Sequence, residues 1–522
     1  MSEQLQIYLN KLRQPFGLAA LSAISHGVEK ESLRVDPSGH LAQTPHPAGL
    51  GSALTHACIT TDFSEALMEF ITPVFRNPAD TVHFLSDLHT FTFTQLPREE
   101  LLWTSSMPCV IADKDKIPLA RYGTSNIAQL KTLYRKGLGY RYGRTMQTIA
   151  GIHYNFSLPD SFWKILHELK GSSEELEEFR TAQYFALIRN FRRLSWLLLY
   201  LFGASPALCK SFVRNNPNHG LENFDDGSLF MPYGTSLRMG DLGYTSKAQS
   251  GLTINYNSLA DYTDGLTKAI KTPYAAYATF VCEDGSPAQV NSNILQMEAE
   301  FYSTIRPKRI PGPDERPVTA LRNHGVEYIE VRCLDLNPFL PVGIDEETML
   351  FLNSFLVYCV LQPSPPSSPT ESAEIDANLK TVVRRGREPR LQLQRDGMSL
   401  SLTAWAHEIL KGVEATAGLL DRAHSLNTHQ AATRAQQGKI DNSSLTPSAR
   451  VLERMRELKT SYFRFAMNQS LANSDYFRSL SMPAAKIEEF LLMSATSNKE
   501  RATIEAGDTM DFAAYLQQFN NK

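Results

Sequence analysis

The sequence lacks the features that would place it in several large classes of protein. Its most apolar run, Leu194–Ala204, is about half of the roughly 20 residues that a helix needs to cross a bilayer. The first residues, MSEQLQIYLNKLRQPFG, lack the basic start and apolar block of a secretory signal. The net charge is −3, from 52 Lys and Arg against 55 Asp and Glu, and gives no pull toward nucleic acid or anionic lipid. We therefore expect a cytoplasmic protein that binds neither nucleic acid nor membrane, with a buried helix at the apolar run.

Cysteine pairs and several common catalytic motifs are also missing. The six cysteines are dispersed and include no CxxC, so we expect reduced thiols without disulfide bonds or a zinc site. The sequence contains no GxxxxGK[ST], GxGxxG, HExxH or GxSxG motif. An enzyme of this sequence that used ATP would have to hold the phosphates through metal ions and side chains. The cysteines are Cys58, Cys109, Cys209, Cys282, Cys333 and Cys359.

The hydrophobic pattern predicts an α+β fold. Short alternating segments in the first third indicate strands, and helical periodicity follows later. The four prolines within Gln362–Thr370 predict a surface loop, so we divide the chain into a core at 1–362, a Pro/Ser-rich loop at 363–372 and a mainly helical region at 373–522. The polar segment Asn427–Asn442 is predicted to be mobile or a loop. Helices are predicted at Glu174–Phe202, Asp345–Leu361, Ala415–Ala423 and Ser448–Gln469.

Candidate chemistry begins in the segment His26–Val35, which has the pattern of a strand. Glu29 and Glu31 share a face with the apolar Leu33 and Val35. Buried carboxylates so close together would repel and lose their hydration unless cations neutralised them. An isolated Glu-x-Glu is usually an exposed edge strand, so the hypothesis of a metal site depends on similar patterns elsewhere.

Three further segments repeat this pattern of polar residues on otherwise apolar strands. Glu69 alternates with apolar neighbours, His153 lies opposite an apolar face, and Glu330 shares a face with Arg332. If these faces converge, they form a polar funnel with oxygen-rich donors for Mg²⁺, or alternatively Mn²⁺. Candidate partners for phosphate or carboxylate groups are Arg238, Arg332 and the run Arg306–Arg309, although that run could equally be a solvated loop. The candidate metal residues are Glu29, Glu31, Asp62, Glu69, His153 and Glu330.

From Gly27 to Phe339 the sequence resembles the gammaproteobacterial glutamate–cysteine ligases. The resemblance implies a glutamine-synthetase-like funnel of antiparallel strands surrounded by helices, with a mainly helical C-terminal third. The segments that carry it, in family order, are GVEKESLRV, LGSALTHACITTDFSEALMEFITP, YGTSNIAQLKTLYRKGL, RYGRTMQTIAGIHYNFSLP, YLFGASPALC, TSLRMGDLGY, NSNILQ, YSTIRPKR and GVEYIEVRCLDLNPF.

The resemblance also implies a reaction and roles for individual residues. ATP would phosphorylate the γ-carboxylate of glutamate, and the amine of cysteine would displace phosphate to give γ-glutamylcysteine, the first step of glutathione biosynthesis. Arg238 resembles a contact to the glutamate carboxylate and Arg332 a group on the transferring phosphoryl, and these two roles could be exchanged. Arg306, Lys308 and Arg309 are the candidates for binding ATP. Asn155 resembles a glutamate-site residue, and Phe63, Tyr134, Leu138, Gln147, Tyr244 and Tyr302 resemble the cysteine pocket.

Two other functions remain open at this point. A related ligase could activate glutamate in the same way but accept another amine, and product identification separates the two. A non-catalytic sensor of glutamate or nucleotide on the same fold would be expected to lack metal carboxylates or arginines, and none is visibly missing. The expected partners are glutamate, cysteine and ATP; we expect a monomer, and feedback inhibition by glutathione is a further property that the resemblance suggests.

Overall fold

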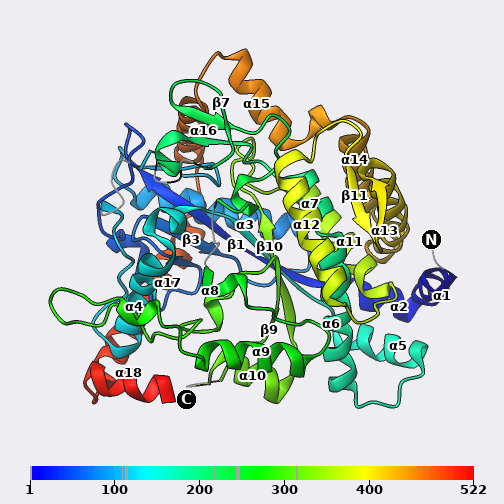
Figure 1. Ribbon diagram of the computed structural model, residues 1–522, viewed down its shortest axis with the longest axis horizontal. Helices are drawn as coiled ribbons and strands as arrows, with labels where there is room; N and C mark the ends of the chain where they lie inside the picture. The colour runs from blue at the N-terminus through cyan, green and yellow to red at the C-terminus, as the bar shows by residue number, and fades with distance from the viewer. Residues whose placement is uncertain are drawn as a thin grey trace.

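The core of the computed structural model is a mixed-length antiparallel sheet with helices around it (Figure 1). The structure describes residues 3–108, 110–111, 116–214, 216, 218–242, 247–312 and 315–521. The strand order is β2-β3-β1-β5-β10-β9, and β4 pairs with the end of β1. The strands are β1 (Ser25–Val35), β2 (Ile59–Thr61), β3 (Leu67–Ile71), β4 (Leu101–Leu102), β5 (Ile152–Ser157), β9 (Ile305–Lys308) and β10 (Tyr328–Leu334).

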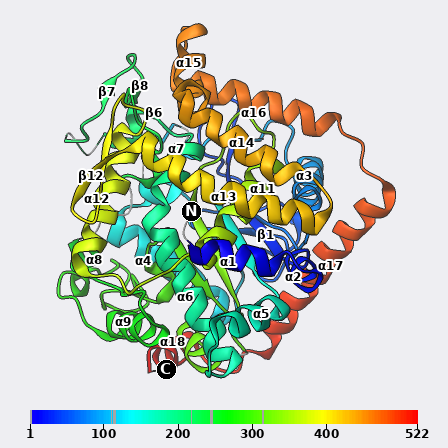
Figure 2. The same cartoon turned by 90° about the vertical axis from the view of Figure 1, so that its right-hand side faces the viewer.

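Helices form most of the remaining structure. In Figure 2, α13 and α14 lie over α11, and α1 lies next to α13. The helices are α1 (Glu3–Leu12), α2 (Pro15–Leu21), α3 (Pro78–Gln95), α4 (Asn126–Tyr142), α5 (Asp160–Lys170), α6 (Leu176–Leu194), α7 (Trp196–Phe202), α8 (Lys247–Ser250), α9 (Leu259–Lys271), α10 (Pro317–His324), α11 (Glu346–Leu361), α12 (Pro369–Arg385), α13 (Leu402–His424), α14 (Thr428–Asp441), α15 (Pro447–Glu457), α16 (Tyr462–Ser479), α17 (Ala484–Gly507) and α18 (Phe512–Asn521). Two small sheets contain β6 (Ala207–Cys209), β7 (Glu222–Asn223) and β8 (Ser228–Phe230), and β11 (Gln392–Arg395) and β12 (Met398–Ser401).

The two faces of the central sheet differ in chemistry because side chains alternate along each strand. Val28, Tyr154 and Val331 are paired across β1, β5 and β10 and are buried in the main hydrophobic core. The neighbouring positions carry polar side chains, and Glu29 pairs with His153 in the same register. The α+β fold class predicted from the sequence is therefore confirmed, and Tyr154 lies in the core while His153 lies with Glu29, as predicted for opposite faces of one strand.

The long apolar segments form helices as predicted. Leu194–Ala204 contains α7, in which every residue is buried, and α6 precedes it. Helix α11 begins after Asp345, whose carboxylate accepts hydrogen bonds from the backbone N–H and hydroxyl of Thr348, and its middle turns are buried all round. Within the described ranges, no helix is long and apolar enough to span a membrane.

The prediction of a loop or mobile segment at Asn427–Asn442 was wrong, because this segment contains α14. Its buried residues recur at helical spacing and include the polar His429 and Gln436. Asp421 accepts a hydrogen bond from the backbone N–H of His429, and the Gln436 amide donates to Glu347. Polar side chains with hydrogen-bond partners thus occupy the face where a sequence pattern requires apolar residues.

The proline-rich segment between α11 and α12 forms neither helix nor strand, and two arginines hold it. Arg189 donates to the carbonyl of Ser364 and Arg193 to that of Pro365. Hydrophobic side chains from before and after this segment, such as Leu9 and Ile409, belong to one core cluster. The division into a catalytic core, a loop and a C-terminal region stays a prediction.

Candidate active site

Glu29 of β1, Glu69 of β3 and His153 of β5 lie together on the polar face of the sheet. One donor atom from each lies within 4.8 Å of the others. His153 Nδ1 is 3.1 Å from Glu29 Oε2, and the Asn155 amide donates to Glu29 Oε1 at 2.8 Å. Carboxylate oxygens with one imidazole suit a hard divalent cation. The residues present therefore fit a metal site.

Two more carboxylates crowd the same face. Glu31 pairs in register with Glu69, and its Oε2 accepts a hydrogen bond from the Gly151 backbone N–H at 2.6 Å. Burial, followed by the charge of Asp62, raises the pKa of Glu31 to about 8. Burial and the charges of Glu29, Asp62 and Glu31 hold the pKa of Glu69 well above its usual value. This excess of buried negative charge is what a bound cation would neutralise.

Glu330 of β10 completes the cluster and joins it to basic side chains. Its Oε1 accepts a hydrogen bond from Arg332 at 3.0 Å and lies 3.5 Å from His153 Nδ1. Its Oε2 is 3.5 Å from Lys308 Nζ and is buried without a hydrogen bond from any described residue. Burial acts to raise the pKa of Glu330, but Arg332, Lys308 and His153 bring it well below its usual value. The carboxylate is therefore ionised, and this oxygen can act as a ligand for a cation.

The two predicted catalytic arginines are neighbours. Arg238 lies in a short 3₁₀ helix, Leu237–Met239, and donates to the Arg332 carbonyl at 2.9 Å. Gly151 makes room for it, because a Cβ at this position would lie 2.0 Å from the Arg238 guanidinium. The Nε of Arg332 is buried and has no hydrogen-bond partner among the described residues. Arg332 also donates to Glu330, and the charges of both arginines act to lower the pKa of Glu31.

The basic run Arg306–Arg309 divides between two environments. Arg306 and Lys308 belong to β9, paired with β10 through Glu330 and Tyr328, and the run is therefore a strand and not the solvated loop considered as its alternative. Arg306 donates to the carbonyls of Ala299 and Phe301. Arg309 instead donates to the carbonyls of His324 and Gly325 at the end of α10. The structure brings Lys308 and Arg306 to the cluster but directs Arg309 to α10.

The residues predicted for a cysteine pocket come from several elements. Phe63 and Gln147 are buried, and the Nε2 of Gln147 has no hydrogen-bond partner within the described chain. Tyr134 and Leu138 are half-buried on α4, four residues apart and hence on one side of the helix. The Tyr302 hydroxyl lies 3.0 Å from the Met239 sulfur, next to Arg238. Tyr244 lies outside the described residues.

Sequence reasoning missed Arg135, which the structure connects to the cluster. Its guanidinium donates to the carbonyl of Asp62 and stacks over the Tyr122 ring at 4.6 Å. The Tyr122 hydroxyl donates to the Thr61 and Asp62 carbonyls, so both side chains hold the turn that presents Asp62. The positive charge of Arg135 also acts on Glu69, where it partly offsets the rise in pKa that burial and the neighbouring carboxylates cause. Its position beside Tyr134, in a segment that carries the family resemblance, was the available signal.

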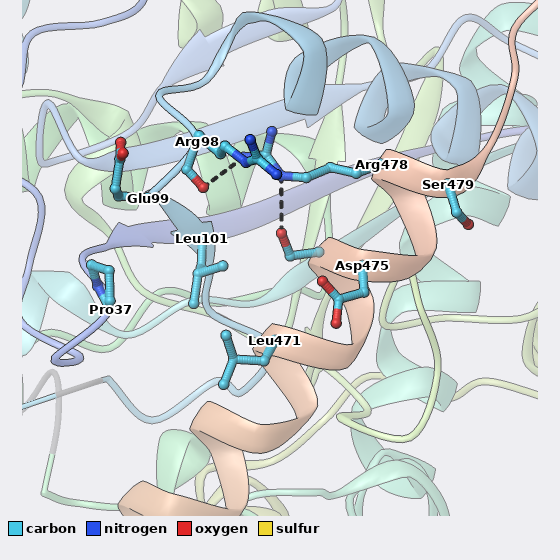
Figure 3. Close-up of a pocket in the computed structure, with 9 residues that line it drawn as sticks. Pro37, Arg98, Glu99, Leu101, Leu471, Asp475, Arg478 and Ser479 are labelled. Carbon is cyan, nitrogen blue, oxygen red and sulfur yellow. Dashed lines mark hydrogen bonds between the residues drawn. The ribbon is translucent and has the colours of Figure 1, made fainter.

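A separate hollow of about 460 Å³ lies between α16 and the approach to β4 (Figure 3). Arg478 extends across it and donates to Ser474 and to the backbone carbonyls of Phe93, Pro97 and Arg98. These bonds tie α16 to the end of α3. None of the predicted site residues lines this hollow. The Arg478 guanidinium stabilises the packing of α16 against α3.

The sheet and its polar face define a class of protein. The fold is of the glutamine-synthetase-like type, an antiparallel sheet surrounded by helices, with carboxylates and arginines on its polar face. A family model described as glutamate-cysteine ligase matches residues 9–382. The glutamate–cysteine ligase of Pseudomonas entomophila is 50% identical over 500 residues, which cover 96% of this chain and 94% of that protein. That of Pseudomonas aeruginosa is 48% identical over 520 residues, 99% of this chain and 98% of that protein.

The solved structures agree. The glutamate–cysteine ligase of Francisella tularensis, in complex with AMP, superposes with a TM-score of 0.89 at 36% identity and covers 95% of this chain and 97% of that one. A bifunctional glutathione synthetase from Pasteurella multocida has a TM-score of 0.74 at 23% identity and covers 95% of this chain and 58% of that one, which shows a shared fold. The chain belongs to the glutamate–cysteine ligase family.

Proposed function

We propose that this protein joins the γ-carboxyl of L-glutamate to the amine of L-cysteine at the polar face of the sheet. The γ-phosphoryl of ATP passes to a γ-carboxylate oxygen, giving ADP and γ-glutamyl phosphate. The cysteine nitrogen then bonds to the acyl carbon and loses a proton, and inorganic phosphate leaves with the electrons of the broken C–O bond. The product is γ-glutamylcysteine, the first intermediate of glutathione biosynthesis.

One observation supports the location of this chemistry more than any other. Glu29, Glu69 and His153 offer three donor atoms within 4.8 Å of one another, and the Oε1 of Glu330 lies 3.5 Å from His153 Nδ1. Phosphoryl transfer needs charge neutralisation around the transferred group, and carboxylate-bound divalent cations supply it. An ATP-dependent ligase without a phosphate-binding glycine loop depends on such a cluster.

The proposed metal residues are the six carboxylate and imidazole side chains of the cluster. These residues would hold Mg²⁺, or alternatively Mn²⁺, because oxygen donors predominate. Such an ion would supply positive charge to neutralise the phosphate groups. Asn155 and His153 hold the Glu29 carboxylate in place from both of its oxygens. The residues are Glu29, Glu31, Asp62, Glu69, His153 and Glu330.

The proposed roles of the basic residues follow from their placement. Arg332, oriented by Glu330, stabilises the transferring phosphoryl, and its unbonded Nε leaves a donor for that purpose. Arg238, which bonds to the Arg332 backbone, binds the glutamate carboxylate together with Asn155. Lys308 and Arg306 neutralise the phosphates of ATP. Arg309 donates to carbonyls at the end of α10, so its proposed role in binding ATP is indirect. It would hold β9, the edge strand that carries Arg306 and Lys308, in position.

The second substrate is proposed to bind between α4 and the segment around Tyr302. A small thiol needs a compact apolar pocket with few polar anchors. Phe63, Tyr134 and Leu138 supply apolar surface, and Gln147 has an unbonded amide for polar recognition. Tyr244 and Tyr302 complete the proposed pocket. We propose in addition a monomeric cytoplasmic enzyme subject to feedback inhibition by glutathione.

Mass spectrometry of the products tests the function. Purified protein is incubated with ATP, Mg²⁺, glutamate and a panel of amines that includes cysteine, 2-aminobutyrate, glycine and ammonia. We expect γ-glutamylcysteine as the major product, with stoichiometric ADP and phosphate. A γ-glutamyl product formed in preference from another amine would assign the chain to a related ligase, and the absence of ATP cleavage with any amine would contradict the proposal.

A further inference from the structure

The end of the described chain makes polar contacts with the first turn of α4. The Thr124 backbone N–H donates to Glu505 at 2.8 Å, and the Asn126 backbone N–H donates to Asp508. The Asn126 side-chain amide donates to the carbonyl of Met510 at 2.8 Å. The first N–H groups of a helix have no partner within it, and carboxylates there also interact favourably with the helix dipole. The end of α17 and the linker to α18 therefore hold the start of α4, whose N-cap is Ser125.

Helix α18 then packs along α4 (Figure 1). Its apolar face, formed by Phe512, Tyr515, Leu516 and Phe519, contacts a small cluster that is separate from the main core. That cluster contains Leu130 and Leu133 of α4 and Val290 of the loop at 290–297. Tyr134 and Met297 pack against it. The Asn520 amide donates to the Val290 carbonyl at 2.9 Å. Helix α18 thus joins α4 to the loop at 290–297.

The other end of this loop, at Gln296, also contacts α4. The Gln296 amide donates to the Tyr134 carbonyl at 3.2 Å, and its carbonyl oxygen accepts from the Val290 backbone N–H at 3.0 Å. Gly137 allows this approach, because a Cβ at this position would lie 2.1 Å from Gln296 Oε1. Tyr134 is consequently held by Gln296 on its backbone and by the cluster under α18 on its ring.

We propose that Asp508 and the apolar face of α18 are positioning residues for the cysteine pocket, acting through α4. This inference depends on the proposed function, because it takes Tyr134 and Leu138 as parts of that pocket. These residues touch no substrate themselves. They set the position of α4, and with it one wall of the site for the second substrate. Glutamate activation depends on the sheet and should not require them.

Two full-length variants test the proposal, each with a matched control. Leu516→Ala removes apolar contact between α18 and α4, and Gln517→Ala on the exposed face of α18 is its control. Asp508→Ala removes the carboxylate at the start of α4, and Glu500→Ala, an exposed carboxylate on α17, is its control. Leu516→Met keeps side-chain volume and should restore the behaviour of the parent protein.

The readouts separate positioning from general loss of structure. We expect Leu516→Ala to raise the KM for cysteine roughly three- to tenfold and Asp508→Ala to raise it about twofold, since a misplaced wall weakens binding of the second substrate. The KM for glutamate and the rate of ATP cleavage with glutamate in the absence of cysteine should stay at parent values. Hydrogen exchange should rise within residues 126–138 in both variants and in neither control.

Three results would each overturn the inference. One is an unchanged KM for cysteine in Leu516→Ala despite increased exchange in α4. Another is a fall in kcat with equal changes in the KM values of all three substrates, which indicates loss of structure without a role in the cysteine pocket. The third is a control variant that behaves like its test variant. Failure of the proposed function is distinguishable, because the parent protein would then form no γ-glutamylcysteine at all.

Discussion

Glu29 and His153 stand directly opposite each other on paired antiparallel strands, with Glu29 Oε2 3.1 Å from His153 Nδ1. Burial and the Arg332 charge lower the pKa of His153 below its ordinary value of 6.5, although Glu29 and Glu330 act to raise it, and a lowered pKa favours the neutral ring at pH 7. A neutral imidazole can offer a lone pair to a metal ion while Asn155 holds the second Glu29 oxygen. The pair therefore joins the register of the sheet to the chemistry of the proposed metal site.

The two half-reactions should separate by mutation. Tyr302→Ala and Tyr244→Ala should mainly raise the KM for cysteine, because both tyrosines are proposed to contact the second substrate. Arg332→Ala should lower kcat by on the order of 10²–10³, since a donor aimed at developing charge acts mostly in the transition state. Steady-state kinetics in all three substrates, with phosphorylation of a sulfoximine analogue of the tetrahedral intermediate, provide the measurement.

Exposed residues of the same types are the controls for these variants. Tyr476→Ala on α16 and Arg454→Ala on α15 should leave every kinetic constant near the parent value. If both tyrosine variants lost turnover at saturating cysteine while Arg332→Ala changed only the cysteine requirement, the assignments of pocket and phosphoryl site would be reversed.

Thiol reactivity should be concentrated at one described cysteine. Cys58, Cys209, Cys333 and Cys359 are buried free thiols, and burial raises the pKa of Cys333 to about 12. Cys282 is partly exposed; weak burial acts to raise its pKa, but hydrogen bonds with Lys136 and Tyr140 bring it below the ordinary value. Iodoacetamide labelling of native protein followed by peptide mapping should therefore modify Cys282 first among these five.

Two results would contradict this account of the cysteines. One is rapid labelling of Cys333 in the folded protein. The other is a folded Cys333→Ser variant without activity, because Cys333 is buried in the main hydrophobic core and is assigned no catalytic role. Denatured, reduced protein should yield all six thiols, including Cys109, which lies outside the described residues.

Stability should fall in mild acid through His56. Its Nδ1 accepts hydrogen bonds from the backbone N–H groups of Cys58 and Ile59, and burial lowers its pKa from 6.5 to about 4. Between pH 6.5 and about pH 4, His56 is protonated in the unfolded chain but neutral in the folded chain. The free energy of unfolding should therefore be unaffected by His56 above pH 6.5 and fall below it, by up to about 1.4 kcal/mol per pH unit.

Urea unfolding at about pH 7 and about pH 5 measures this contribution. His56→Asn keeps a side-chain acceptor for the turn but cannot titrate, so the loss of stability between the two pH values should be smaller than in the parent protein. Equal losses in both proteins would mean that other groups, such as the buried His26, carry the whole acid sensitivity.

Much of the sheet could be predicted because strand alternation is a local property. The pattern around Glu29, His153 and Glu330 identified which side chains share a face, and the register then placed them together. Convergence itself was only a hypothesis, since pairing between β1 and β5 joins residues that are far apart in sequence. The resemblance to a known family supplied the reaction and the roles, which no single strand contains.

Other features could not be predicted because they depend on tertiary partners. The segment of α14 has the composition of a loop, and only Asp421 and Glu347 make its buried polar residues acceptable. Arg135 resembles any surface arginine on a helix until Tyr122 and the Asp62 carbonyl are in place. The contact of α18 with α4 joins the last described helix to residues 126–134, and no local pattern signals it.

The carboxylate cluster is proposed to bind the divalent metal that turnover needs. Glu29→Gln and Glu330→Gln test this binding most directly. Each removes a ligand charge with little change in shape, and Glu222→Gln, an exposed glutamate of β7, is the control. The measurement is Mn²⁺ binding by electron paramagnetic resonance, together with Mg²⁺-dependent turnover and circular dichroism. The account predicts weakened Mn²⁺ binding and loss of most turnover in both variants, with unchanged dichroism and a normal control. Near-parent turnover at limiting Mg²⁺ in either folded variant would contradict it.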